Sequence, residues 1–150
     1  RPNPFPATGD RFGEAVVGFD GRIVASAPND DTGAVDSGTV YFFDGMTGSI
    51  DMILSPPSGL ASGRFGAQLA TVRDRLAIQW EGAGVLDSGQ VLIYDTAGAL
   101  IQTLSSPAPT AGSDFGAAMA EFDGQLLVGA PLQDVGGNVD AGAAYVFKVN

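Results

Sequence analysis

A chain of 150 residues, 45% of them hydrophobic, is long enough for one structural domain with a buried core, and its composition excludes disorder. The net charge of −10 argues against nucleic acid as a partner, and no apolar run approaches the roughly 20 residues of a membrane-spanning helix, so we expect no membrane insertion. The absence of Cys and His excludes disulfides, thiolate nucleophiles, Cys/His zinc sites and Ser-His-Asp triads.

The first eleven residues, 1–11, are rich in proline. Proline lacks a backbone donor and favours an extended chain that does not join a sheet. The segment is similar in composition to two later stretches, Pro56–Gly59 and Pro107–Pro109. We therefore predict a linker here and not a strand.

A first repeat, 12–57, contains four short runs of β-branched and aromatic residues separated by Gly, Asp and Pro. The dipeptide Asp20-Gly21 is typical of a tight hairpin turn. The pattern predicts four strands, over Gly13–Phe19, Arg22–Ala27, Thr39–Phe43 and Ser49–Leu54.

A second repeat, 58–109, and a third, 110–150, follow the same plan, and Phe-Gly pairs recur at Phe12, Phe65 and Phe115. The third repeat predicts a strand over Ala143–Phe147 and then stops, without its outer strand. The second repeat predicts strands over Gly66–Val72, Arg75–Gln79, Gln90–Tyr94 and Ala99–Leu104.

Each repeat reads as a four-stranded antiparallel meander that is apolar on both faces, with almost no helix. A single sheet of this kind cannot bury two faces alone. Packing like sheets radially, as in a β-propeller, buries both. We predict an all-β fold of three propeller-type blades, the third lacking its outer strand, which form one structural domain within a larger ring or oligomer.

The Phe-Gly pairs, the later Gly129-Ala130-Pro131 and the segment Asp140–Phe147 resemble FG-GAP repeats, over residues 12–147. FG-GAP repeats build the β-propeller of integrin α-subunits and of many bacterial surface and secreted proteins. The resemblance implies an extracellular or cell-surface module that works in adhesion or structure and binds protein. It also implies ligand contact through the loops Asn29–Ser37, Gly82–Ser88 and Leu132–Ala141.

The resemblance raises the question of whether this chain binds calcium as a cofactor. In the family, Asp-rich loops in the first hairpin of a blade bind it. Here those hairpins are cut to Phe19–Gly21, Val72–Asp74 and Phe122–Gly124. One carboxylate per turn does not supply the roughly six to eight oxygen ligands that calcium takes. We therefore expect no metal site and no cofactor.

Trp80 and Glu81 stand where the family has Ala-Pro, and two interpretations of them remain open. An aromatic ring beside a carboxylate at a loop mouth can stack on a sugar or anchor a protein partner. Alternatively, Trp80 fills space between neighbouring blades. The loop carboxylates of Asp30, Asp31 and Asp134 also have two interpretations: a rim that binds a cation or a basic partner, or caps on turn amides.

The terminal residues Tyr145, Val146 and Phe147 predict an apolar strand edge that invites another chain, so we expect self-association or a protein partner. A carbohydrate-binding propeller with a glycan ligand is the alternative, and a propeller hydrolase is the third. Hydrolysis of a glycoside needs two facing carboxylates. Because nothing in the sequence selects such a pair, we expect no enzyme activity.

Overall fold

The computed structural model describes all 150 residues and is all-β. Eleven strands form three antiparallel sheets of four, four and three strands, which confirms the predicted class and the three meanders. The single helical segment is a short 3-10 turn, Val85–Asp87. No helix in the chain is long and apolar enough to cross a membrane.

Strands follow one another in sequence order within every sheet. Sheet 1 contains β1 (Val16–Phe19), β2 (Arg22–Ala27), β3 (Thr39–Asp44) and β4 (Ile50–Leu54). Sheet 2 contains β5 (Phe65–Val72), β6 (Arg75–Trp80), β7 (Gln90–Tyr94) and β8 (Leu100–Ser105). Sheet 3 contains β9 (Ala118–Phe122), β10 (Gln125–Ala130) and β11 (Ala143–Lys148), and it lacks a fourth strand, as predicted.

The first strand of sheet 1 begins at Val16 and not at Gly13, so the sequence prediction is wrong for three residues. Gly13 has a φ of 88°, and its N–H donates to the carbonyl of Ser26 at 2.7 Å. The hydroxyl of Ser26 accepts the N–H of Ala15 at 3.1 Å. With these contacts the regular pairing of β1 with β2 begins only at Val16, opposite Ala25. The other predicted strand ends agree to within one residue.

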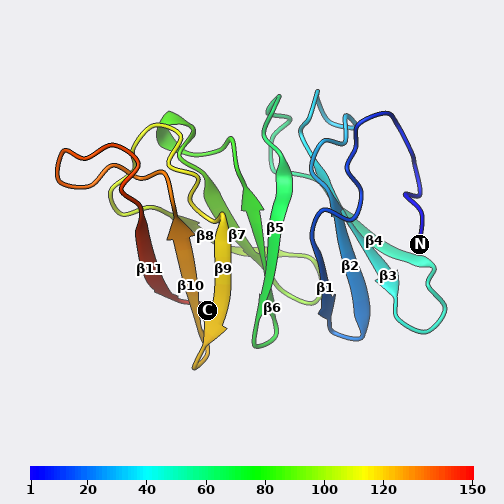
Figure 1. Cartoon of the computed structure of the whole chain (residues 1–150). Helices are drawn as coiled ribbons and strands as arrows, with labels where there is room; N and C mark the ends of the chain where they lie inside the picture. The colour runs from blue at the N-terminus through cyan, green and yellow to red at the C-terminus, as the bar shows by residue number, and fades with distance from the viewer.

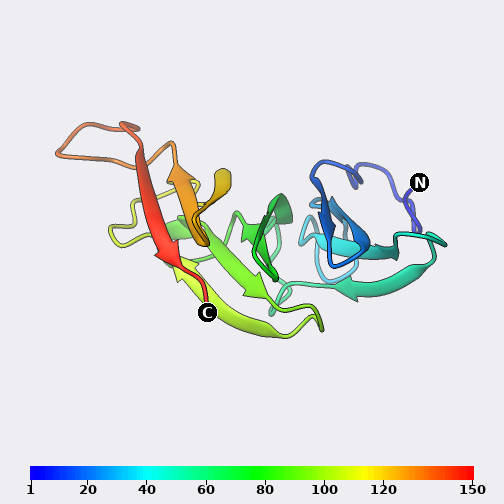
Figure 2. The same cartoon turned by 90° about the horizontal axis from the view of Figure 1, so that it is seen from below.

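The three sheets stand side by side, with sheet 2 between the other two (Figure 1). Their first strands are neighbours, because β5 contacts both β1 and β9. Seen from below, the sheets fan out at angles to one another (Figure 2). Sheet 2 is therefore the only sheet with another sheet on both faces.

Two hydrophobic cores fill the spaces between the sheets. The first, between sheets 1 and 2, contains Phe42 and Ile78, and the second, between sheets 2 and 3, contains Ile93 and Leu126. Successive side chains of a strand point to opposite faces, so Ile78 enters the first core and its neighbour Ala77 enters the second. The middle sheet thus buries both of its apolar faces.

Candidate functional site

The three loops that the sequence marks for ligand contact lie at one end of the sheets, along the top of Figure 1. Each connects the second strand of a sheet to the third. This end of the molecule is the candidate site.

Trp80 is the last residue of β6 and lies in the first core, with 7% of its surface exposed. The indole Nε1 has no hydrogen-bond partner. It lies so close to Gly63 that a Cβ on that glycine would be 2.6 Å from Nε1. In the structure the ring packs between two sheets, as the second interpretation of this residue describes.

Glu81 belongs to an ion-pair network that joins sheets 1 and 2. Arg64 Nη1 lies 2.6 Å from Glu81 Oε2, and Arg64 Nη2 lies 3.0 Å from Glu14 Oε1. Arg11 Nε is 2.8 Å from the other oxygen of Glu14, an ion pair without hydrogen-bond alignment. Bonds between charged partners are stronger than neutral ones, and the Arg64 side chain is only 26% exposed. The Glu81 carboxylate therefore serves a contact between sheets.

Asp30 is a buried anchor of its loop, with 3% of its surface exposed. Tyr41 Oη donates to its carboxylate at 2.6 Å, and the N–H of Thr32 donates at 2.9 Å. Burial opposes the charged form, but the hydrogen bonds from Thr32 and Tyr41 outweigh it and hold the pKa of Asp30 below its usual range. Burial, followed by the neighbouring Asp30, raises the pKa of Tyr41.

Asp31 and Asp134 are exposed, and each closes a turn within its own loop. Asp31 Oδ1 accepts the N–H of Asp36 at 2.8 Å, and Asp134 Oδ1 accepts the N–H of Asp140 at 3.0 Å. These bonds are those of the turn-capping interpretation. No group of three or more Asp, Glu, Cys or His side chains is placed to hold a metal ion.

A hollow of about 230 Å³ opens between the loops of sheets 2 and 3. Asp114, on its wall, accepts a hydrogen bond from Gln79 Nε2 at 2.8 Å. Three carboxylates give the hollow a negative character that suits a basic group. It is lined by Glu81, Gly82, Asp87, Gly112, Asp114 and Leu132.

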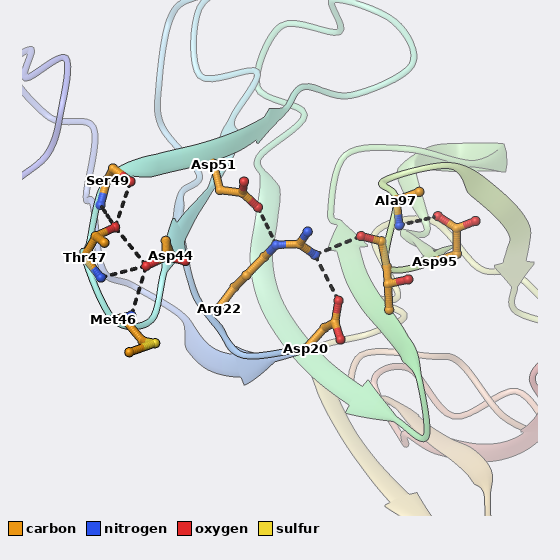
Figure 3. Close-up of polar contacts among 10 residues, drawn as sticks. Asp20, Arg22, Asp44, Met46, Thr47, Ser49, Asp51, Asp95 and Ala97 are labelled. Carbon is orange, nitrogen blue, oxygen red and sulfur yellow. Dashed lines mark hydrogen bonds and ion pairs between the residues drawn. The ribbon is translucent and has the colours of Figure 1, made fainter.

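At the opposite end of the sheets, Arg22 in β2 reaches from sheet 1 to sheet 2 (Figure 3). Its Nη1 donates to the carbonyl of Thr96, in the turn between β7 and β8, at 2.8 Å. The same guanidinium pairs with the carboxylates of Asp20 and Asp51. This end of the sheets is thus held by an arginine that no sequence motif marks.

Arg75 holds the place of Arg22 in the second repeat and has the same role. Its Nε donates to the carbonyl of Asn150 at 2.8 Å, which ties sheet 2 to the end of the chain after β11. Nearby turns are closed by aspartates: Asp44 accepts the N–H of Thr47 at 2.6 Å, and hydrogen bonds from that residue hold the pKa of Asp44 below its usual range (Figure 3). The sequence signal for this role is an arginine as the first residue of the second strand, which occurs in sheets 1 and 2.

The three residues of the predicted edge lie in β11, the unpaired edge strand of sheet 3. The rings of Tyr145 and Phe147 pack on Phe115 in the second core, with centroids 6.1 and 5.7 Å away. Val146 points to the opposite face and is 58% exposed. Of the three side chains, Val146 is the one that is open to a partner.

No family model matches this chain, and a search of curated proteins finds no similar sequence. The function is therefore inferred from the sheets, the loops and the free surfaces. Contacts within the fold occupy most of the candidate ligand residues. The edge of β11 and the outer face of sheet 3 have no neighbouring strand or sheet. The outer face of sheet 1 also lacks a neighbouring sheet, but the N-terminal segment covers part of it, where Phe12 packs on Tyr41 and Phe43.

Proposed function

We propose that this chain is a non-catalytic interaction module of three FG-GAP-like, propeller-type blades, with a structural or adhesive role outside the cell or at its surface. The observation that carries the proposal is the repetition of one apolar sheet three times, with only the middle copy covered on both faces. Radially packed sheets need a neighbour on each face. Two of the three sheets here still lack one.

The proposed contacts use the exposed blade edges. The edge strand β11 has a row of unpaired backbone groups on one side and the exposed Val146 on one face. Such an edge is a template for pairing with another chain. The net charge of −10 suits a partner with basic groups, and it suits solubility of the free chain.

The solution mass tests the proposal, by light scattering on a sizing column. We expect a species near twice the 15.2 kDa of the chain or larger. Val146→Lys places a charge in the edge strand and is expected to weaken the association, while Met46→Lys, at a turn residue that is 98% exposed, leaves it unchanged. A chain that stays monomeric at millimolar concentration contradicts the proposal.

The carbohydrate-binding alternative is tested in the same samples. Trp80 is the only tryptophan, so its fluorescence reports on its surroundings alone. Association that is unaffected by sugars supports the structural role. A fluorescence change that saturates with sugar supports the carbohydrate-binding role instead.

A further inference from the structure

One backbone joint connects sheet 1 to sheet 2. The N–H of Phe65 donates to the carbonyl of Ser37 at 2.9 Å, and the N–H of Ser62 donates to the carbonyl of Val35 at 2.8 Å. The acceptor residues belong to the loop before β3, and the donors belong to the segment that leads into β5. The joint is therefore made by main-chain atoms of consecutive repeats.

The same joint connects sheet 2 to sheet 3. The N–H of Phe115 donates to the carbonyl of Ser88 at 2.8 Å, and the N–H of Gly112 donates to the carbonyl of Leu86 at 3.1 Å. In both joints the donors are the Phe of a Phe-Gly pair and the residue three positions before it. In both joints the acceptors lie one and three positions before the glycine that precedes the third strand. The fold thus makes one contact twice.

The two halves of a third joint stand free at the ends of the row of sheets. The equivalent donors are the N–H groups of Gly9 and Phe12, and the equivalent acceptors are the carbonyls of Val139 and Ala141. None of these four groups takes part in a hydrogen bond in the structure. Unpaired backbone groups gain free energy when a partner supplies the missing bond.

Both free halves already have the backbone conformation of the finished joints. In the acceptor loops, φ is 50° at Asp36, 52° at Asp87 and 52° at Asp140, so the free loop matches the two joined ones. In the donor segments, φ is 55° at Arg11 and 48° at Arg64. Little conformational entropy remains to be lost when such halves meet.

The outer face of sheet 1 corresponds to the faces of sheets 2 and 3 that are buried against the preceding sheet. Ile23 is the second residue of β2, and its equivalents in β6 and β10 are Leu76 and Leu126. Both leucines are fully buried against the preceding sheet, whereas Ile23 is 44% exposed. We call this surface the head face; its apolar residues are Phe12, Val16, Ile23, Ala25 and Phe43. Phe12 packs against Ala25 and Phe43, which are each 4% exposed, so Val16 and Ile23 form its exposed part.

The outer face of sheet 3 likewise corresponds to the faces of sheets 1 and 2 that are buried against the following sheet. Val146 is the fourth residue of β11, and its equivalents in β3 and β7 are Phe42 and Ile93. These two are fully buried against the following sheet, whereas Val146 is 58% exposed. We call this surface the tail face; its residues are Ala118, Ala120, Phe122, Leu127, Ala144 and Val146.

The glycines of the Phe-Gly pairs show which residues meet in a joint. A Cβ on Gly66 would lie 2.9 Å from Val40, and a Cβ on Gly116 would lie 2.9 Å from Val91. The free glycine of the head face, Gly13, has nothing within 4 Å of that position. The tail-face residue that is equivalent to Val40 and Val91 is Ala144.

We propose that the head face of one copy of this chain docks on the tail face of a second copy. Phe12 N–H donates to the partner's Ala141 carbonyl, and Gly9 N–H donates to the partner's Val139 carbonyl, while the two apolar faces close over each other. The contact continues the row of sheets by the joint that the chain already makes twice. It rests on the interaction role proposed above, but it replaces strand edges with sheet faces. Because each copy carries one head and one tail, the contact is heterologous.

Two complementary variants test this joint by light scattering or sedimentation. Ile23→Arg blocks the head face and Ala144→Arg blocks the tail face, since each buries an unpaired charge in the joint. We expect either variant alone to associate at least about tenfold more weakly than the unmodified chain. The control Met46→Arg adds the same charge at a turn residue outside both faces and associates normally.

The mixture of the two variants gives the decisive result. Ile23→Arg keeps an intact tail and Ala144→Arg keeps an intact head, so an equimolar mixture is expected to form a 1:1 dimer. Val16→Arg and Val146→Arg, at residues that are each 58% exposed, repeat the test if one of the first pair does not fold. Circular dichroism of each variant verifies the folded state.

Association that survives both single variants, or a mixture that stays monomeric, overturns the joint and leaves the interaction role to the edge of β11. Pairing of two β11 edges needs no head face, so Ile23→Arg would then dimerise normally. An unmodified chain that is monomeric at all concentrations overturns the interaction role itself. The two failures are therefore distinguishable.

Discussion

The hydroxyl of Tyr41 donates a 2.6 Å hydrogen bond to the carboxylate of Asp30, and both side chains are buried. The bond ties the loop before β3 to the strand itself. In the third repeat, Tyr145 and Gln133 hold the same places, and Gln133 Nε2 donates to the Tyr145 hydroxyl at 2.5 Å. The same contact between loop and strand is therefore made with a carboxylate in the first repeat and with an uncharged amide in the third.

Tyr41→Phe removes the charged anchor and is expected to lower the free energy of unfolding at pH 7 by about 1–3 kcal/mol, since the buried carboxylate loses a donor. The folded-state pKa of Asp30 is below its ordinary value of 3.8, so its stabilising contribution is present above that pH and is lost as pH falls through the folded pKa. The effect of Tyr41→Phe on the free energy of unfolding therefore shrinks in acid. Urea unfolding at about pH 2.5 to 7 measures it, because this range spans the ordinary pKa of an Asp carboxyl.

Tyr145→Phe is the matched control for that experiment. Its partner Gln133 does not titrate, so the free-energy loss of this variant is expected to be independent of pH over the same range. Parallel pH profiles for the two variants would contradict a charged Asp30 as the partner of Tyr41.

Trp80→Ala is expected to lower the free energy of unfolding by about 3–5 kcal/mol, because it leaves a large cavity between sheets 1 and 2. Trp80→Phe keeps an aromatic ring and removes an N–H that has no partner in the structure. Its cost is expected to stay below about 1.5 kcal/mol. Chemical unfolding followed by circular dichroism compares the two. Equal losses would contradict the space-filling role of an aromatic ring at this position.

Gly66→Ala and Gly13→Ala separate backbone strain from crowding. Both glycines have positive φ, 91° and 88°, so both variants bear a similar backbone cost of about 1–2 kcal/mol. Only at Gly66 does the new Cβ meet side chains, those of Ser26 and Val40 at 2.8 and 2.9 Å. We expect Gly66→Ala to lose a further 1–3 kcal/mol or so in unfolding experiments at low protein concentration. Identical losses would show that sheet 1 moves away from the added methyl group.

Calcium at millimolar concentration is expected to leave the melting temperature unchanged. The first hairpin of each sheet carries a single aspartate, and that of sheet 1, Asp20, already pairs with Arg22 at 3.3 Å. Differential scanning calorimetry with and without chelator measures the shift. A rise of several degrees that the chelator reverses would show a calcium site, because a ligand stabilises the state that binds it.

Most of the fold follows from local patterns in the sequence. The strands β2 and β7 have the predicted ends, because turn residues and apolar runs mark both boundaries. The segment 13–15 was missed because its conformation depends on Ser26, a residue on the neighbouring strand. The amino-acid types of a segment do not reveal backbone contacts of this kind with another strand.

The candidate site is much less predictable. The guanidinium of Arg64 meets Glu81, next to it in sheet 2, and Glu14, which is fifty residues away and precedes the first strand of sheet 1. Only the packing of the two sheets brings Arg64 and Glu14 together. The sequence also leaves the direction of Trp80 open, because a residue at a strand end can face either a loop or a core. Asp30 and Asp31 are neighbours in sequence, yet one is buried and the other exposed.

The middle position of sheet 2 sets the order in which the fold opens. In a row of units that touch only their neighbours, an end unit loses one interface when it unfolds, whereas the middle unit loses two. Amide hydrogen exchange should therefore be slowest in β5–β8, with β1–β4 and β9–β11 fraying independently at lower cost. A protein seated on either outer sheet turns an end unit into an internal one, so binding registers as slower exchange across that whole sheet and not only at the contact.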